Sequence, residues 1–597
     1  MKAEPRTIND LFESSVRYIV PLYQRPYVWN EEDQWEPLWR DLRDLLDGGL
    51  SITADMDHFM GAIVLQDEEE HIPGSIPEFT VIDGQQRLTT LQLVLAAAAT
   101  VARVRGLDKE ADILADLVRN NPKKATGDAV YKVWPTNQNR AAFRATVDAS
   151  LNGAAAQADD ARNTIHEAHA YFARMIHEWL EEENVDDAGA AMTRLRAALT
   201  DQVQLVSITL RSSDNSQMIF ETLNARGTPL QAMDLLKNAV FHDAQKHGVN
   251  TDHLYEDVWK PQLDDPYWRV ERRQGRLTRP TGDLFLMHWL TMRTKAPVSA
   301  TKLFPVFRKS ELGQNRPQPV EALIRTICHH AGTYRSFDAF EPGTLEGEFV
   351  GRLEDLDTTV VYPVVLRLFI DASIAETKRR RALSVLESWL VRRAIMGWTS
   401  KSYNKFVVDW LNLIDGKPTT ADDELLNCLK GYDGPSNKWP TDEEIQNELQ
   451  QQPLYERLRP RRVAMVLRAV ELKLRDDPED EKLSRKLSVE HVIPQGWNEK
   501  HWPLPANLQA EAAANERQRS IHLLGNLTLT RGRLNTGLSN KAWKEKQPLL
   551  NKKSVMLLNN QLIAAYPEVF DEMSIVERGR DLTKHILSIW PGPAADW

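Results

Sequence analysis

The sequence predicts an α+β protein of several domains: a small α/β domain with a helical insertion, a mostly helical middle, and a C-terminal domain of short strands and a basic helix. Its 597 residues exceed what one hydrophobic core usually organises. Short β-branched and aromatic runs fill about the first 90 residues, helical patterns follow, and short apolar runs return near the end. We place the domains at 1–241, 242–475 and 476–597, with the insertion at about 93–200.

The composition is that of a water-soluble globular protein. Hydrophobic residues make up 42% and charged residues 27% of the chain, and the mean hydropathy is -0.46. The N-terminus lacks the basic-then-apolar order of a secretory signal, and we expect no membrane segment. Cys328 and Cys428 are the only cysteines, which fits a reducing compartment and excludes a four-cysteine zinc site. We therefore expect a cytoplasmic protein.

The elements of the N-terminal domain follow from their residue patterns. Apolar, β-branched and aromatic runs at 17–29, 58–69 and 78–84 predict strands that are separated by Pro, Gly and acidic residues. From Leu88 to about residue 200 the pattern is helical, and a further strand is predicted at 204–210. A helix, a turn and a second helix are expected to close the domain by Phe241.

The third of these strands leads into a turn suited to an anion. The segment 79–95 reads FTVIDGQQRLTTLQLVL, which predicts strand, tight turn and helix. We expect Asp83 to cap the helix, Gly84 to allow the close turn, and Arg87 to add a bidentate contact. Backbone amides at a helix N-terminus stabilise phosphate, so the turn predicts a phosphate site, although an ordinary capped helix has the same pattern.

An aromatic run near the N-terminus suggests a second recognition element. Tyr23, Tyr27 and Trp29 alternate with Gln24 and Arg25. Such rings stack on a base or on a modified DNA group. The alternative is that they pack in the core of the small α/β domain, and the sequence leaves both interpretations open.

The strongest chemical signal lies in two C-terminal segments, SVEHVIPQGW at 488–497 and LLGNLTLTRGRLNTGLSNKAWKEK at 523–546. His491 is suited to act as a base that takes a proton from water. Asn526 is placed to fix the imidazole, and Asn535 offers a hard oxygen to Mg²⁺. Glu490 precedes His491 on a strand, so its side chain points to the opposite face unless the turn at Pro494 distorts the strand end.

These two segments lie in a basic region of an acidic chain. The net charge is -11, which alone argues against a nucleic-acid partner, but residues 484–556 hold twelve Lys or Arg against five Asp or Glu. Lys544 is one of the positive charges that we expect to contact phosphate. His501 and His522, in the same region, are expected to be structural.

The C-terminal motifs resemble the HNH, or His-Me finger, domain of GmrSD-type modification-dependent restriction endonucleases, over about residues 485–550. The resemblance implies a ββα-metal fold that hydrolyses phosphodiester bonds with Mg²⁺ or Mn²⁺. By position it makes His491 the general base, Asn526 the middle Asn, and Asn535 and Glu490 metal-binding positions. Asn540 and Lys544 match two further positions of the family motif. The resemblance assigns Asn540 to the metal and Lys544 to catalysis.

The segments 19–29, 83–91 and 219–238 are similar to the N-terminal domain of the same enzymes, which has a ParB and sulfiredoxin-like fold. The resemblance implies binding and hydrolysis of a nucleoside triphosphate without a Walker-type loop, none being present. The positions that match are Asp83, Gly84, Gln85, Gln86 and Arg87, joined by Asn224, Arg226 and Lys237.

The expected function is therefore a nucleotide-regulated endonuclease that cuts foreign double-stranded DNA, with modified phage DNA as the expected target and a homodimer as a possible assembly. One alternative is a toxin-like nuclease that acts on unmodified DNA or RNA. Another is a nucleotide-switched DNA-binding regulator that does not cut. Dependence of cleavage on the modification of the DNA separates the first two functions, and loss of metal-dependent cleavage with intact DNA binding in His491→Ala would exclude the regulator.

Overall fold

The computed structural model describes residues 2–21, 24, 26–48, 58–67, 76–152, 163–182, 188–210, 231–274, 277–314, 316–475, 483, 487–505 and 509–597. The chain divides into two compact units, residues 1–257 and 258–597. The predicted α+β class is confirmed, because one unit contains a mixed sheet and the other is mostly helical. The helical middle and the C-terminal strands belong to the same unit.

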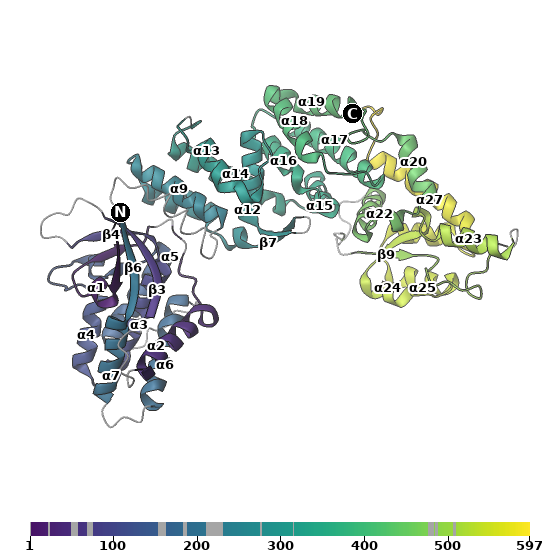
Figure 1. The fold of residues 1–597 in the computed structure, drawn as a ribbon. Coiled ribbons are helices and arrows are strands. Elements are labelled where there is room, and N and C mark those ends of the chain that lie inside the picture. The colour runs from purple at the N-terminus through teal and green to yellow at the C-terminus, as the bar shows by residue number, and fades with distance from the viewer. Residues whose placement is uncertain are drawn as a thin grey trace. The chain divides into compact units, whose positions relative to one another are not determined.

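Unit 1 is built on a six-stranded mixed sheet of order β1-β6-β3-β4-β2-β5 (Figure 1). Its strands are β1 (Lys2–Thr7), β2 (Arg17–Ile19), β3 (His58–Asp67), β4 (Glu78–Asp83), β5 (Val133–Trp134) and β6 (Val203–Leu210). The strands predicted at 58–69, 78–84 and 204–210 are β3, β4 and β6. The sequence pattern missed β1, a polar strand that is half exposed and that pairs with β6 in the described part of the sheet.

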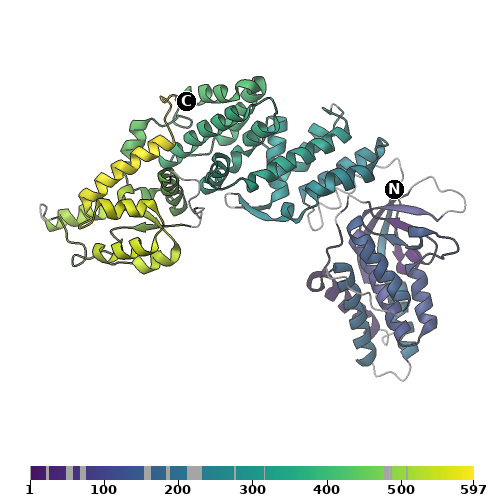
Figure 2. The same ribbon diagram turned by 180° about the vertical axis from the view of Figure 1, so that it is seen from behind.

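The main core lies between this sheet and a layer of helices (Figure 2). The helices of unit 1 are α1 (Ile8–Phe12), α2 (Glu36–Gly48), α3 (Gln85–Val104), α4 (Asp108–Val118), α5 (Asn137–Leu151), α6 (Thr164–Glu182), α7 (Ala188–Ala197), α9 (Ala232–Lys246) and α10 (Thr251–His253). α3 is apolar and long enough to cross a membrane, but 83% of its most apolar window is buried inside the unit. Its alanines let α4, α5 and α6 pack closely around it.

The other face of the sheet carries a smaller apolar cluster. Val64 of β3, Ile82 of β4 and Leu210 of β6 are buried there, and Leu235 of α9 packs against them. Neighbouring residues such as Ile63 and Val81 instead belong to the main core, as expected from the alternation of side chains along a strand. The sheet is therefore apolar on both faces, and β4 leads from it directly into α3.

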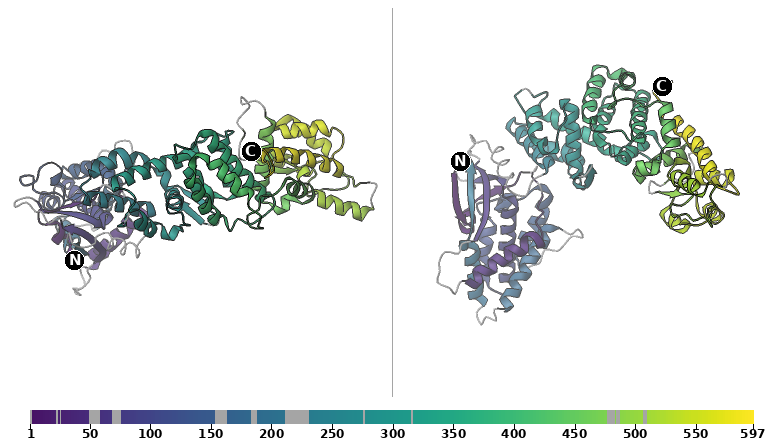
Figure 3. Two further views of the ribbon diagram at one scale, coloured as in Figure 1. Left: turned by 90° about the horizontal axis from the view of Figure 1, so that it is seen from above. Right: turned by 45° about the vertical axis from the view of Figure 1, so that its right-hand side comes forward.

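Unit 2 is a helical body with two small two-stranded sheets (Figure 3). Its first helices are α11 (Lys260–Leu263), α12 (Thr281–Thr294), α13 (Leu303–Glu311), α14 (Val320–Ser336), α15 (Leu345–Leu356), α16 (Tyr362–Ile370), α17 (Glu376–Ile395), α18 (Tyr403–Gly416) and α19 (Ala421–Lys430). They are followed by α20 (Asp442–Gln451), α21 (Leu454–Arg457), α22 (Pro460–Leu474), α23 (Ala510–Ser520), α24 (Gly532–Leu538), α25 (Trp543–Lys553), α26 (Leu557–Ala565) and α27 (Glu572–Ile589). The two antiparallel sheets pair β7 (Glu271–Gln274) with β8 (Leu277–Pro280), and β9 (Ser488–His491) with β10 (Leu527–Thr530).

The C-terminal part of unit 2 is anchored on the helical middle. Glu471 of α22 is fully buried, and its carboxylate accepts from the backbone N–H groups of Leu557 and Leu558 at 2.9 and 2.8 Å. It thereby caps α26 from another helix. Trp590, after α27, donates its indole N–H to Glu387 of α17 at 3.2 Å. These contacts join the C-terminal part to the helical middle within unit 2.

Candidate functional site

The predicted C-terminal site lies where β9 ends. β9 pairs antiparallel with β10, with His491 opposite Leu527 and Glu490 opposite Thr528, and α24 follows β10 (Figure 1). Along the chain, α23 lies between the two paired strands, and α24 comes directly after the second strand. Successive side chains on a regular strand point to opposite faces, so Glu490 and His491 are directed into different surroundings.

His491 is enclosed by three neighbouring side chains, and only 7% of it is exposed. The Gln495 amide nitrogen lies 3.4 Å from both ring nitrogens, and Tyr455 of α21 sets its ring edge-on at a centroid distance of 4.5 Å. The ring of His522 is 5.4 Å away. Burial, and then electrostatic interactions with His522 and Lys546, lower the pKa of His491 to about 4. The imidazole is therefore neutral at physiological pH, with a lone pair on one ring nitrogen.

Asn526 fixes the loop after His491 and does not contact the imidazole. Its fully buried amide accepts from the backbone N–H of Ile493 at 2.8 Å and donates to the carbonyls of Ile493 and Ile521 at 2.9 and 2.8 Å. We expected it to hold the ring directly. In the structure it holds the backbone on which the ring is carried, because its amide meets peptide groups that have no other partner there.

Gly525 permits this arrangement, because α27 passes directly against it. A Cβ atom at this position would lie 1.8 Å from the carbonyl oxygen of Ile575 and 2.8 Å from the backbone nitrogen of Gly579. The same turn is held by Arg578, which donates to the carbonyl oxygens of Gly525 and Leu527 at 2.6 and 2.7 Å. The Gly-Asn pair is thus fixed by close packing on one side and by backbone hydrogen bonds on the other.

Gly525→Ala is expected to destabilise unit 2 by about 3 kcal/mol or more, because the new methyl group overlaps a helix backbone that cannot yield as a side chain would. Urea unfolding followed by circular dichroism measures this change. Gly532→Ala is the matched control, because a Cβ there meets nothing within 4 Å. An unfolding curve of Gly525→Ala that coincides with that of Gly532→Ala would contradict the packing described here.

Glu490 is engaged by Lys546 of α25. The Lys546 ammonium donates to Glu490 Oε1 at 2.6 Å and to the carbonyl oxygen of His491 at 2.8 Å, and both side chains are buried. Burial raises the pKa of Glu490 and lowers that of Lys546, and the attraction between the two charges opposes both shifts. Glu490 therefore does not fit the role of a direct metal ligand in this structure, because its carboxylate is bound to an ammonium on the face away from His491.

The remaining C-terminal candidates lie further from the imidazole or outside the description. Asn540 packs on the loop after His491, where a Cβ on Gly496 would lie 3.0 Å from the Asn540 amide nitrogen. Lys544 is exposed and points away from the buried Lys546 on the same helix. The side chain of Asn535 is outside the described part. Within the part that is described, no group of three His, Cys, Asp or Glu residues is gathered to hold a metal.

Sequence reasoning missed four residues at this site. The sequence analysis chose Lys544 instead of Lys546. The two lysines differ only in which side of α25 faces β9, and the sequence does not show this. Gln495 had no pattern of its own, and His522 was expected to be structural. Tyr455 comes from α21, a helix that no motif connects to His491, although its backbone N–H donates to the His522 carbonyl at 3.2 Å.

The N-terminal turn is built differently from the prediction. Gly84, at φ 89°, occupies the N-cap of α3, and there is no side-chain cap. Asp83 therefore does not cap the helix, because it is still the last residue of β4, paired with Val64. A Cβ on Gly84 would lie 2.6 Å from the side chain of Ile63, so both the backbone angle and the packing require glycine.

The polar side chains of the turn hold neighbouring backbone. Gln86 accepts from the N–H of Val28 at 2.9 Å and donates to the carbonyl of Pro26 at 3.0 Å. Arg87 donates to the carbonyl of Ala62 at 3.0 Å and lies against Gly61. Gln85 is partly exposed on the first turn of α3. The first turn of α3 is thus joined to β3 and to the segment 26–28.

The aromatic run is also part of this framework. Gln24, 6% exposed, donates to the carbonyls of Val81 and Ile82 at 2.6 and 3.2 Å. The buried Tyr27 hydroxyl is 2.7 Å from Thr90 Oγ1 and accepts from the indole of Trp35. Trp29 packs on the core as a partly buried side chain. For these three residues the core interpretation fits the structure, whereas Tyr23 and Arg25 lie outside the described residues.

Of the other nucleotide-site candidates, only Lys237 is described. It is buried on α9, and its ammonium lies 5.5 Å from the ring centroid of Tyr255. Asn224 and Arg226 fall in the segment 211–230, outside the described residues. Of the predicted nucleotide-binding set, the structure therefore brings residues 84–87 together on one turn.

Two family models match the chain. The N-terminal domain of the GmrSD restriction endonucleases matches residues 8–241, and their C-terminal domain matches residues 439–585. The second match begins ahead of β9 and includes α20, α21 and α22, so it contains Tyr455 as well as His491. Comparison with curated proteins gave no match.

Proposed function

Because the chain belongs to the GmrSD restriction endonuclease family and its partner is therefore DNA, we propose that it is an HNH endonuclease. It cuts foreign DNA, with modified phage DNA as the target, and a nucleoside triphosphate regulates it. The observation that carries this proposal is the strand end at His491. There a neutral imidazole stands on a backbone held by Asn526 on one side and by Lys546 on the other.

In this proposal His491 takes a proton from the water that attacks the phosphodiester bond. A base held neutral by burial is in the correct state at physiological pH, and proton transfer of this kind contributes about 10²- to 10⁴-fold. Tyr455 and Gln495 cover the ring in the structure. DNA binding has to displace at least one of them before water reaches the base.

A divalent cation, Mg²⁺ or Mn²⁺, belongs to the proposal as the source of charge neutralisation at the phosphate. The ion pair of Glu490 with Lys546 argues against Glu490 as its ligand. The candidates on the His491 side are Asn540, which packs on the loop after His491, and Asn535, which the resemblance assigns. We derive no chemical step from the cation. Mn²⁺ binding measured by electron paramagnetic resonance, with and without Asn540→Ala, tests the assignment directly.

The nucleotide part of the proposal rests on the turn from β4 to α3. Its amides stand at the N-terminus of a long helix with no capping side chain, a geometry that stabilises phosphate. Arg87 and Gln85 flank these amides. Arg87 also donates to the backbone of β3, so a phosphate that draws it away would break a contact between the first turn of α3 and an interior strand of the sheet.

A cleavage assay tests the function as a whole. Plain plasmid DNA and plasmids that carry methylated, glucosylated or phosphorothioate groups are incubated with the full chain and Mg²⁺, with and without nucleoside triphosphates. We expect cleavage of at least one modified DNA, and we expect triphosphate to alter the rate for the wild type but not for Arg87→Ala. Equal cleavage of plain DNA would support the toxin-like nuclease, and DNA binding without cleavage would support the regulator.

A further inference from the structure

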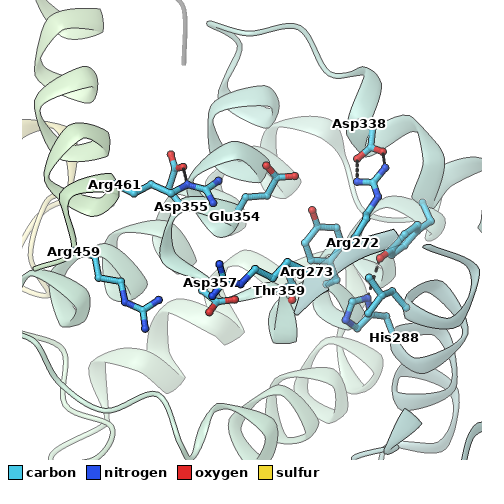
Figure 4. A pocket seen from close by; sticks show the side chains of 13 residues that line it. Arg272, Arg273, His288, Asp338, Glu354, Asp355, Asp357, Thr359, Arg459 and Arg461 are labelled. Carbon is cyan, nitrogen blue, oxygen red and sulfur yellow. Dashed lines mark hydrogen bonds and ion pairs between the residues drawn. The ribbon is translucent and has the colours of Figure 1, made fainter. Parts of the chain in front are cut away.

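A cavity of about 440 Å³ lies in unit 2 (Figure 4). Its walls come from β7, from α12, α14, α15 and α16, and from the N-terminal end of α22. None of its lining residues belongs to the DNA-cleaving site or to the turn at Gly84. We propose that this cavity binds a nucleoside monophosphate, with the base on an aromatic floor and the phosphate at the start of α22.

The floor contains a buried imidazole that lacks one hydrogen-bond partner. His288 is 3% exposed, stacks on Tyr362 at a centroid distance of 5.4 Å, and contacts the Tyr334 hydroxyl through Nδ1 at 3.1 Å. Its Nε2 has no partner among the described residues. An unpaired buried polar atom costs about 1–3 kcal/mol, so such atoms are usually satisfied by a ligand or by water. The ring stays neutral, because burial lowers the pKa of His288 to about 3.

A nucleobase supplies what this floor lacks. The base is flat, so it packs against aromatic side chains, and its edge carries both hydrogen-bond donors and acceptors. A neutral imidazole with one nitrogen bound to a tyrosine hydroxyl offers either a donor or an acceptor at the other nitrogen. Either tautomer of His288 therefore finds a partner on the base.

The start of α22 supplies the anion site. Arg459 is the N-cap residue, Arg461 and Arg462 lie in the first turn, and that turn has no acidic residue and no capping side chain. Positive side chains at the positive end of a helix dipole are unfavourable, and a bound anion reverses this. Arg461 pairs with Asp355 at 2.6 Å, and Arg462 donates to the Leu356 carbonyl at 2.7 Å.

Arg459 is the cation that remains available for a phosphate. It makes no hydrogen bond or ion pair with any described residue, and Figure 4 shows its side chain reaching into the cavity. On the opposite wall Arg272 is paired with Asp338, so that guanidinium is already neutralised. The cation available for a ligand is thus Arg459, at the N-terminal end of α22. The ring nitrogen without a partner is Nε2 of His288, on the floor of the cavity.

The carboxylates of the cavity favour one phosphate over three. Glu354, Asp355 and Asp357 also line the cavity, and Asp355 is paired with Arg461 (Figure 4). They repel a polyphosphate chain, but they accept hydrogen bonds from sugar hydroxyls. The volume is in the range of small-molecule sites. Base, sugar and single phosphate therefore correspond to the aromatic floor, the acidic wall and the arginine corner.

Isothermal titration calorimetry of the full chain tests the proposal with AMP, GMP, CMP and UMP, and with inorganic phosphate and the matching nucleosides as separate titrants. We expect at least one nucleoside monophosphate to bind more tightly than its nucleoside and more tightly than phosphate. Arg459→Ala, at an exposed position, is expected to weaken this binding about 10-fold or more. His288→Phe keeps the ring but removes its nitrogens, and it is expected to reduce the preference among bases.

The controls identify the site. Arg580→Ala removes an exposed arginine of α27 in the same unit, and Arg87→Ala removes the arginine of the N-terminal turn, and both are expected to leave this binding unchanged. Absence of binding by all four nucleotides would overturn the proposal. Loss of binding in Arg87→Ala with full binding in Arg459→Ala would also overturn it, as would binding of phosphate as tight as that of the nucleotide. Because no cleavage is measured, these outcomes are independent of the proposed nuclease activity.

Discussion

His491→Ala is expected to slow the proposed metal-supported DNA cleavage by about 10²-fold or more and to leave DNA binding intact. The reason is that the neutral imidazole at the end of β9 is the proposed proton acceptor, and general-base catalysis contributes about 10²- to 10⁴-fold. Single-turnover cleavage of a plasmid substrate measures the rate, and a gel-shift assay with the same DNA measures binding. His501→Ala is the matched control, because His501 is an exposed histidine of the same region.

The pH dependence gives an independent check. A histidine with a lowered pKa keeps its base form to lower pH than an ordinary histidine, whose pKa is about 6.5. Burial lowers the pKa of His491 to about 4 in the free protein, so kcat/KM is expected to hold its value through pH 6 and to fall only as the pH approaches 4. A His491→Ala variant that cuts as fast as His501→Ala would refute the catalytic assignment.

Lys546→Met lowers the free energy of unfolding of unit 2 by about 3–5 kcal/mol, because it leaves the buried Glu490 carboxylate without its partner. The lost donor also frees the His491 carbonyl, so cleavage falls as well. Urea unfolding measures the stability, and Glu490→Gln combined with Lys546→Met is expected to recover part of it, since the uncompensated charge is then absent.

Lys544→Met is the matched control for Lys546→Met, since Lys544 is exposed on the same helix. Its change in stability is expected to stay within about 0.5 kcal/mol. Equal losses in the two variants would show that the phase of α25 against β9 is not the one described. Loss of cleavage in Lys544→Met alone would restore the role that the sequence motif assigned to it.

The alternation of residue types along the chain predicted much of the fold. β3, β4 and β6 stand where apolar and β-branched runs lie between turn residues, and the alanine-rich text after Leu88 forms α3. β1 was not predicted, because its residues are polar and its place depends on pairing with β6, far along the chain. Local patterns determine strands that bury side chains, whereas a polar edge strand is determined by its partner.

The sequence indicated which types of residue lie at the candidate sites, but it did not indicate the hydrogen bonds that their side chains make. Adjacent positions on β9 were expected to face apart, and Glu490 does lie with Lys546 on the face away from His491. The partners of Asn526, Gln86 and Gln24 come from segments that are distant in the sequence. A single sequence does not show these partners, so the three polar residues were interpreted as ligand contacts. In the structure these amides hold backbone. Single-sequence patterns do not separate these two uses of an amide.

The cap that Glu471 places on α26 limits how the parts of this chain are exchanged in evolution. A gene fusion that transferred residues 476–597 alone would separate the amides of Leu557 and Leu558 from their acceptor and the indole of Trp590 from Glu387. The transferred fragment would carry unmet polar groups and newly exposed apolar surface. A gene fusion that transfers the nuclease part intact is therefore expected to join near residue 257, where the chain passes from one compact unit to the next.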